Sequence, residues 1–372
     1  MRKLFALIGL AVALAVSGPA LGADCGQQPA AWERWQNFRS GLISPEGRVI
    51  DYSDERHITT SEGQSYALFF ALVDNDPQLF RRILRWTEKN LARGDLTSYL
   101  PAWLWGRKPG GEWGVLDDNS ASDADLWIAY TLIEAGRLWR QHSYSALGSL
   151  LLQRMAREEV AELPGLGAML LPGKHGFAHD GYWKLNPSYL PPQLVVRAAR
   201  AQPAGPWPAL ARSAERLLID SAPKGLAPDW TSWTGKRFEA RTDEERIGSY
   251  DAIRVYLWVG MLHDDAPGAQ RLKRHFMPVE RHVDPNGRLG EEIDIYRETA
   301  HGKGPAGFSA ALLPLLSATP ASAALRAYLQ SAPSGSLGYY SQVLALFGGG
   351  WDEGRYRYGA DGTLLPRWEK CR

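Results

Sequence analysis

Residues 120–139 read SASDADLWIAYTLIEAGRLW, and this stretch decides the fold, because its apolar residues recur with the period of an α-helix. The same periodicity returns along the whole chain and predicts twelve helices. They are expected at 29–40, 60–74, 77–92, 120–139, 144–160, 188–201, 206–220, 248–262, 267–283, 304–316, 320–330 and 336–347. Alternation typical of strands is scarce, with candidates only at Gly47–Asp51 and Phe177–Trp183. The sequence therefore predicts an all-α protein.

The connections between the expected helices are short after even-numbered helices and mostly long after odd-numbered ones. The long connections are 41–59, 93–119, 161–187, 221–247 and 284–303. If consecutive helices run antiparallel, all of them emerge at one end of the molecule, and long loops in compact domains are usually functional. This pattern predicts an (α/α)6 barrel with an open substrate groove at one end. The rival, a helical solenoid, lacks a repeat of fixed period.

The composition excludes one class of partner and points to another. The 372 residues hold 42 Lys and Arg against 41 Asp and Glu, whereas proteins that bind polyanions usually carry a strong basic excess. Tryptophan is in surplus, with 15 Trp against 10 Phe. Because a buried indole N–H needs a partner, the surplus suggests aromatic platforms, with a Trp-rich core as the alternative. Six tryptophans lie in the long connections: Trp103, Trp105, Trp113, Trp183, Trp230 and Trp233.

The N-terminus has the form of an export signal. Arg2 and Lys3 precede the apolar stretch Leu4–Val16, which is too short to span a membrane, and small residues near Ala23 offer a cleavage site. We expect residues 1–23 to be a signal peptide. No long Ser/Gly-rich or charged linker divides residues 24–372, so this part is expected to be one domain, soluble after export.

Two cysteines remain, Cys25 and Cys371, one at each end of the mature chain. In an oxidising compartment they are expected to form a disulfide that ties the termini together, with two unpaired thiols as the alternative. His175 and His179 lie in a Gly-rich stretch without a helical pattern, which does not favour a metal site. We expect neither a metal nor an organic cofactor.

Three acidic residues stand at the starts of even-numbered helices: Glu62, Asp123 and Asp251. They should therefore gather at the end of the molecule that carries the long loops, which we call the elaborated end. Arg254, one turn after Asp251, could pair with one of them. The alternative is helix capping. Thr59-x-x-Glu62, Ser61-x-x-Gln64 and Ser120-x-x-Asp123 all have the form of a capping box.

Paired carboxylates beside exposed aromatic rings are typical of a glycoside hydrolase groove. One acid must be protonated to assist the leaving oxygen, and the other must be ionised to activate water or to attack the sugar. Indole faces suit the apolar faces of sugar rings. A neutral polysaccharide also fits the near-zero net charge of the chain.

Several segments resemble glycoside hydrolase family 8. Its signature is similar to Ala121–Ala129 with Ala135 and Trp139, although Thr131 departs from the usual Ser or Ala. The two other catalytic segments resemble Ser61–Gln64 and Ser249–Arg254. Further matches are Gly47–Asp51, Pro101–Gly106, Asn186–Pro192, Ala222–Gly225 and Gly304–Ala310, in the family's order and over nearly the whole mature chain.

The resemblance implies an (α/α)6 barrel that hydrolyses internal bonds of β-1,4-glucan with inversion. It implies Glu62 as general acid, Asp251 as general base and Asp123 as the residue that holds and distorts the sugar. In an inverting enzyme the carboxyl groups of acid and base stand roughly 6.5–9.5 Å apart. The substrate-binding residues that it implies, or that the loops add as candidates, are Trp103, Tyr250, Arg254, Tyr339, Tyr340, Trp105, Trp113 and Trp183. For Tyr339 and Tyr340 the alternative is ordinary helix packing.

Within the family, the resemblance is to periplasmic glucanases that accompany bacterial cellulose synthase. It implies a periplasmic location, a cellulose chain as partner and a functional association with the synthase. Other polymers stay open at this point: xylan, mixed-linkage glucan or chitosan, the last because Asp117, Asp118, Glu291 and Glu292 could meet ammonium groups. A different class is a non-catalytic glucan-binding export factor, which would not require all three acids.

Overall fold

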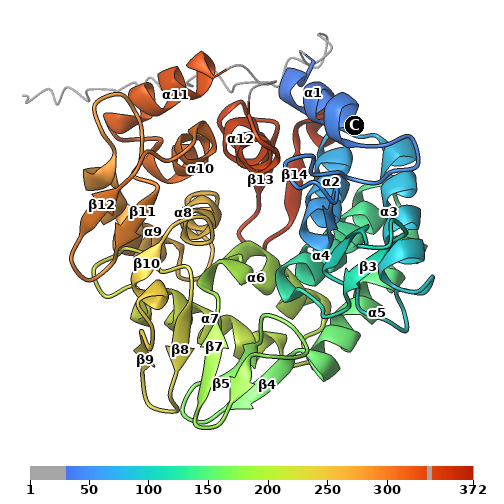
Figure 1. Ribbon diagram of the computed structural model, residues 1–372, viewed down its shortest axis with the longest axis horizontal. Helices are drawn as coiled ribbons and strands as arrows, with labels where there is room; N and C mark the ends of the chain where they lie inside the picture. Colours follow the sequence, from blue (N-terminus) through green and yellow to red (C-terminus); the bar gives the residue numbers. More distant parts are fainter. Residues whose placement is uncertain (1–30, 333–336, 372) are drawn as a thin grey trace, which may run out of the picture.

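The computed structural model describes residues 31–332 and 337–371, and within them twelve α-helices follow one another around a ring (Figure 1). The helices are α1 (Glu33–Leu42), α2 (Ser61–Val73), α3 (Pro77–Leu91), α4 (Ser122–Leu138), α5 (His142–Glu158), α6 (Pro192–Ala201), α7 (Trp207–Asp220), α8 (Ala252–Gly260), α9 (Ala269–Phe276), α10 (Ala306–Leu316), α11 (Ala321–Ser331) and α12 (Tyr339–Asp352). Each corresponds to an expected helix. The expected (α/α)6 barrel is therefore confirmed.

The even-numbered helices form the inner layer of the ring, and the odd-numbered helices form the outer layer (Figure 1). Helices α8 and α10 are buried along their whole length, α2 and α4 nearly so, and α12 through its middle, which explains why they are largely apolar. The outer helix α3 buries one stripe, including Leu79, Ile83 and Leu91, and turns charged residues to solvent. Each outer helix packs on an inner neighbour, and α1 packs on α12 to close the ring.

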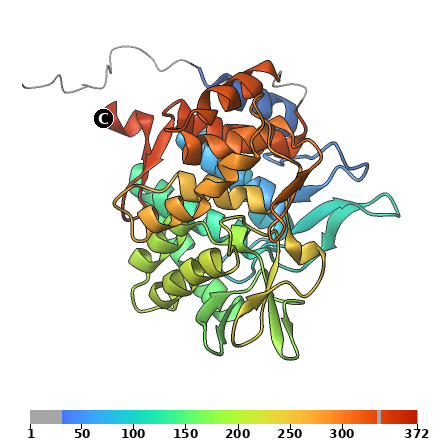
Figure 2. The same cartoon turned by 90° about the vertical axis from the view of Figure 1, so that its left-hand side faces the viewer.

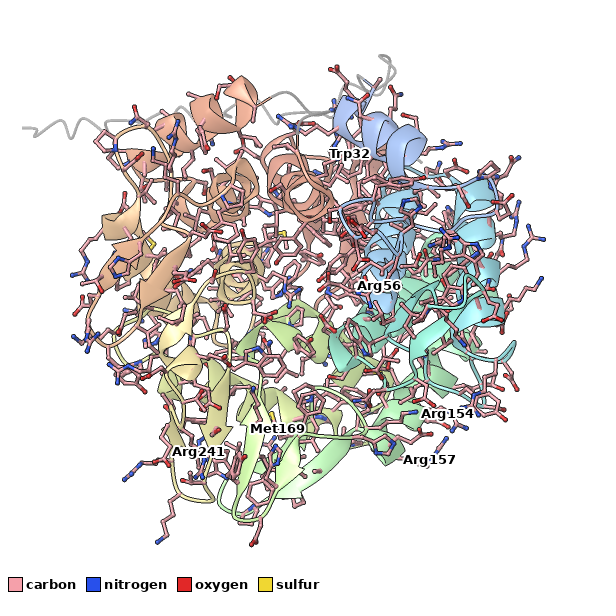
Figure 3. The ribbon with its side chains drawn as sticks, viewed as in Figure 1. Trp32, Arg56, Arg154, Arg157, Met169 and Arg241 are labelled. Carbon is pink, nitrogen blue, oxygen red and sulfur yellow. The ribbon has the colours of Figure 1, made fainter. Side chains whose placement is uncertain are left out.

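Aromatic rings from four inner helices fill the centre of the ring. Tyr66 of α2, Trp127 of α4, Trp258 of α8 and Phe347 of α12 lie with ring centroids 5.0–6.4 Å apart. Such contacts stabilise beyond the area that they bury. Figure 3 shows the middle of the ring filled with side chains, while Arg154 and Arg157 of the outer helix α5 lie at its rim. Part of the tryptophan surplus is thus core, as the alternative held.

Within residues 31–332 and 337–371, fourteen short strands lie between the helices and after α12, and most of them were not among the expected strands. They form five antiparallel sheets, in the orders β1-β2-β3, β4-β5, β6-β7-β8-β9, β10-β11-β12 and β13-β14. The strands are β1 (Thr59–Thr60), β2 (Leu104–Arg107), β3 (Trp113–Asp117), β4 (Val160–Leu163), β5 (Gly167–Leu170), β6 (Ala178–His179), β7 (Tyr182–Leu185), β8 (Thr231–Trp233), β9 (Phe238–Glu239), β10 (Ile247–Gly248), β11 (Glu292–Asp294), β12 (Thr299–His301), β13 (Tyr356–Tyr358) and β14 (Leu364–Pro366). Of the two candidates, 177–183 overlaps the β6–β7 hairpin, whereas 47–51 makes only isolated bridges.

Figure 2 shows that the long connections project from one end of the ring, with the β2–β3 hairpin reaching furthest, while β13 and β14 lie at the opposite end. The lopsided loop lengths in the sequence thus correspond to an elaborated end and a plain end. Among the described residues, every helix is too short or too polar to span a bilayer. The expected signal peptide and Cys25 lie outside the described residues, so cleavage and the disulfide stay predictions.

Close packing of α10 against α12 can be tested at two neighbouring glycines. A Cβ at Gly348 would lie 1.8 Å from the backbone oxygen of Ala310, whereas at Gly349 its nearest neighbour would be 3.6 Å away. We expect Gly348→Ala to lower the free energy of unfolding by about 1–3 kcal/mol or more, because backbone must move. The control Gly349→Ala should be neutral or stabilising by up to ~1 kcal/mol, since alanine favours helix. Urea unfolding measures both, and equal effects would contradict this packing.

Candidate active site

Glu62 lies in the first turn of α2 with its carboxylate free of the expected capping role. The N-cap is Thr60, whose hydroxyl accepts the N–H of Gly63 at 3.0 Å. The hydroxyl of Thr59 instead donates to the carbonyl of Val49 at 2.6 Å. Gln64 also faces away, with its side chain bonded to Val49, Gly47 and Thr87. Capping therefore does not account for Glu62.

Asp123 and Asp251 occupy the corresponding places on α4 and α8. Asp123 is 3% exposed, and its carboxylate accepts the N–H of the next residue, Ala124, at 2.8 Å. Ser120, its expected capping partner, bonds to Glu159 instead. Asp251 is the N-cap residue of α8, but its side chain makes no capping bond. Because the inner helices share one direction, all three acids lie at the elaborated end.

Arg254 of α8 joins the three carboxylates. It is 3% exposed, with one guanidinium nitrogen bonded to Glu62 and the other 2.5 Å from Asp251 and 3.9 Å from Asp123. Ser188 fixes the guanidinium from behind, because its hydroxyl oxygen accepts from Nη2 at 2.9 Å and from Nε at 3.3 Å. The expected pairing of Arg254 with a carboxylate thus involves all three acids.

The environment of Glu62 and Asp123 favours their protonated forms. Burial raises the pKa of Glu62, against the opposing effect of Arg254, and the negative charge of Asp251 adds to the rise. Burial and the nearby Glu62 raise the pKa of Asp123 to about 7. One guanidinium cannot balance three carboxylates in a buried site, so protons are retained. The site therefore offers a protonated acid at neutral pH.

Asp229, which the sequence analysis missed, anchors the start of α8. One of its carboxylate oxygens accepts the backbone N–H groups of Ser249, Asp251 and Ala252 at 2.8, 3.0 and 2.7 Å. Burial and the charge of Asp251 raise the pKa of Asp229 to about 6, despite these bonds. Asp229 comes from the connection after α7, so no helical spacing relates it to Asp251.

Tyrosines surround the acids. Tyr66, one turn after Glu62, is buried and hydrogen-bonds to the carboxylate of Glu62. The hydroxyl of Tyr340 donates to the carbonyl of Tyr250 at 2.5 Å. Tyr250 is 45% exposed, and its own hydroxyl donates to Glu291 at 2.8 Å. The hydroxyl of Tyr339 is buried against the first turn of α2. A Cβ added at Gly63 would lie 2.6 Å from this hydroxyl oxygen. Tyr340 and Tyr250 are thus at the site, and Tyr339 supports α2.

Trp103 lies between the two acid-bearing helices α2 and α4. Its carbonyl accepts the N–H of Ser61 at 2.9 Å, and its N–H donates to the carbonyl of Asn119 at 2.8 Å. Its indole is half-buried, and no ring or cation of residues 31–332 and 337–371 stacks on it. The backbone of Trp103 thus lies next to the start of α2, and its indole carries no stacked ring or cation among these residues.

Trp105 and Trp113 form a stack on the β2–β3 hairpin, away from the three acids. Their rings are 5.4 Å apart and nearly parallel, and the guanidinium of Arg48 lies 4.3 Å from one and 4.7 Å from the other. Trp113 is 49% exposed at the elaborated end. The stack stiffens the hairpin and leaves a ring open to solvent.

The tryptophans of the β6–β9 sheet are placed less openly. Trp183 lies opposite Trp233 in the sheet, so both point to the same face, which packs against the core. Trp233 is buried and donates its indole N–H to the carbonyl of Pro164 at 2.9 Å. Trp230 lies against Tyr189, Phe177 and Lys184. Of this group, Trp230 reaches towards the acids through Tyr189, whose ring lies 5.7 Å from the Arg254 guanidinium.

Comparisons with known proteins show the family of this chain. The family model described as "Glycosyl hydrolases family 8" matches residues 13–354. This chain belongs to glycosyl hydrolase family 8. It is 50% identical over 353 residues to "Endoglucanase" of Escherichia coli O157:H7, covering 94% of this chain and 95% of the relative. It is 49% identical over 368 residues to "Endoglucanase" of Xanthomonas axonopodis pv. citri, covering 97% and 95%.

A solved family 8 relative has the same architecture. The structure of "endo-1,4-D-glucanase from Vibrio fischeri ES114" matches with a TM-score of 0.87 and 45% identity, over 91% of this chain and 99% of that chain. Family 8 membership makes the chain a glycoside hydrolase. Hydrolysis of a glycosidic bond requires a pair of carboxyl groups, and three carboxylates lie around Arg254 at the elaborated end.

The anchoring of α8 by Asp229 can be tested by two substitutions. We expect Asp229→Ala to lower the free energy of unfolding by about 1–3 kcal/mol, because three backbone N–H groups lose their acceptor. One of these three groups is the backbone N–H of Asp251. Because Asp251 would then be held less firmly, kcat/KM should fall as well. Asp229→Asn keeps an acceptor oxygen and should lose much less of both. Urea unfolding and steady-state kinetics measure the difference, and equal losses in the two variants would contradict the anchoring role.

Proposed function

We propose that this chain is an inverting endo-β-1,4-glucanase, with Glu62 as general acid and Asp251 as general base. The observation that carries the proposal is the single buried Arg254 shared by Glu62, Asp251 and Asp123. It sets the two catalytic carboxyl groups on opposite nitrogens of one rigid guanidinium. The relatives named above are endoglucanases, which supports glucan as the substrate.

The surroundings of the two acids suit these roles. The raised pKa of Glu62 keeps a proton available for the leaving oxygen. The side chain of Asp251 is 27% exposed, against 4% for Asp123, so a water molecule can reach it. Asp123 lies deeper, and we assign it the binding and distortion of the sugar beside the scissile bond. No covalent intermediate is needed, because the activated water attacks the sugar directly.

The groove residues follow from the same geometry. We assign Trp103 to stacking on a sugar, because its backbone bonds to Ser61, the neighbour of Glu62, and no ring or cation of the described residues stacks on its indole. Tyr250 and Tyr340 hold the sugar and the backbone next to Asp251. Trp105 and Trp113 suit a more distant sugar of a long chain. Trp183 stays a candidate for substrate contact, although the face that it shares with Trp233 packs against the core.

The biological setting is part of the proposal. The export signal of residues 1–23 supports delivery to the periplasm, with residues 24–372 as the mature catalytic domain. There the enzyme would cut cellulose chains as they are made and exported, in functional association with the synthase. Chitosan is less well supported, because Asp118 lies 3.8 Å from Arg93 and Glu291 is bonded to Tyr250.

We expect Glu62→Gln to lower kcat on carboxymethyl-cellulose by about 10²–10⁴-fold, because the amide cannot donate the proton of the acid. Cello-oligosaccharide binding and the unfolding curve should change little. Asp118→Asn is the matched control, an exposed acid at the same end that lies away from Arg254, and it should keep full activity. Release of reducing ends measures both, with xylan and chitosan as alternative substrates. Full activity of Glu62→Gln would overturn the role of Glu62, and binding without cleavage by the wild type would favour a non-catalytic export factor.

Stereochemistry provides an independent check. Inversion of a β-linked glucan yields the α-anomer first, whereas retention yields the β-anomer. Proton NMR of the first products from cello-oligosaccharides distinguishes the two. A β-anomer as first product would require a covalent intermediate and would contradict the assignment of Asp251 as base.

The free face of Trp103 leads to a further expectation. Trp103→Ala should raise KM for cello-oligosaccharides roughly tenfold, the equivalent of ~1.4 kcal/mol of lost stacking, with a smaller effect on kcat. Trp103→Phe keeps a ring and should recover part of the loss. An unchanged KM in the alanine variant would show that no sugar stacks there.

A further inference from the structure

Two carboxyl groups that the proposed mechanism does not use lie buried behind Asp123. Asp125, on the first turn of α4, is 0% exposed, and Glu159, the residue that ends α5, is 1% exposed. The two carboxyl groups lie within hydrogen-bonding reach of each other, and a bond between them requires a proton on one of the two. They join the start of the helix that carries Asp123 to the end of its outer neighbour.

A count of hydrogen-bond donors shows how this pair is satisfied. The hydroxyl of Ser120 donates to Oε1 of Glu159 at 2.6 Å. No other N–H or O–H group of the described residues reaches Oε2 of Glu159 or either oxygen of Asp125. Two ionised carboxylates cannot bond to each other, and a buried charge without a partner is very costly. At least one proton must therefore lie between the two acids.

We propose that Asp125 and Glu159 share a proton and are positioning residues that hold Asp123 in place. Asp125 is two residues from Asp123, so the bond between Asp125 and Glu159 fixes the turn of α4 that presents Asp123. The part of this inference that concerns activity rests on the proposed function, whereas the shared proton does not.

The surrounding backbone makes this position rigid. The N–H of Ser122 donates to the carbonyl of Pro172 at 3.0 Å, and the N–H of Leu171 donates to that of Glu159 at 2.8 Å. Gly173 lies so close that a Cβ would stand 2.3 Å from the carbonyl oxygen of Ser120. Segment 171–174 thus covers the acid pair and keeps water away from it.

The charged groups that face the pair are few. Any negative charge on Asp123 or Glu158 disfavours a further charge on the pair, whereas the cation of Lys174 has the opposite effect. If the pair lost its proton, a new negative charge would arise beside Asp123. The shared proton therefore protects both the packing and the electrostatic setting of the sugar-binding acid.

The pair makes stability depend on pH in a defined direction. Burial raises the pKa of Glu159 to about 8 and that of Asp125 well above its usual range. The unfolded chain releases these protons near pH 4, whereas the native protein keeps them. Unfolding thus releases protons above pH 4, and the unfolding constant rises by up to about tenfold per pH unit for each retained proton.

The decisive variant is Asp125→Asn, which is neutral at every pH and can still donate to Glu159. We divide the unfolding constant of this variant in urea by that of the wild type at each pH. We expect this ratio to be at least tenfold lower at pH 8 than at pH 5. The control is Glu134→Gln, a buried acid on the same helix that bonds to Arg137 and Arg197. It should be destabilised by a similar factor at both pH values.

Activity supplies a second measurement. Asp125→Ala removes the shared proton and leaves a gap, so kcat/KM on cello-oligosaccharides should fall more than tenfold, and Asp125→Asn should restore most of it. Equal destabilisation of Asp125→Asn at pH 5 and pH 8, or activity as low as that of Asp125→Ala, would overturn the inference. If Asp125→Ala does not fold, the unfolding comparison of Asp125→Asn with the wild type still decides. Full activity of Glu62→Gln would instead refute the proposed function and leave the proton pair standing.

Discussion

The guanidinium of Arg254 is the interaction on which the site depends. Burying one cation is costly unless carboxylates surround it, and three carboxylates around one cation leave an excess of negative charge. The excess is relieved by protons, which the raised pKa values of Glu62 and Asp123 record. The presence of a protonated acid thus follows from the charge count around Arg254. Ser188, fixed by Asn186 at 2.7 Å, keeps that guanidinium from turning away.

The barrel brings these groups together through helix direction alone. Inner helices α2, α4 and α8 begin at the same end, and the positive ends of their dipoles face the acids. Aromatic contacts among Tyr66, Trp127 and Trp258 hold the three helices at fixed separations just below the site. The core and the site therefore depend on each other, because a shift of one helix would move both an aromatic ring and an acid.

The helices could be predicted from the sequence because each offers several turns of apolar periodicity. Most strands could not, since β1 and β9, for example, span two residues each, too few to show alternation. Glu62, Asp123, Asp251 and Arg254 were found because each lies within a helix start that a local pattern marks. Asp229 and Ser188 were missed as site residues because they reach the site from loops, and only the folded chain brings them to α8. The capping-box pattern placed the N-cap of α2 at Thr59, whereas the next residue, Thr60, caps this helix.

The filled centre of the ring has a consequence for how a polymer can approach. Since Phe347 and the rings around it occupy the axis, no chain can thread through the barrel. A polysaccharide must lie across the elaborated end, entering and leaving sideways over the loops. Such an encounter does not require a free chain terminus, and after one cut both pieces can depart without sliding. The solid core thus leaves bonds in the interior of an exposed chain open to attack, because no chain end has to enter a tunnel.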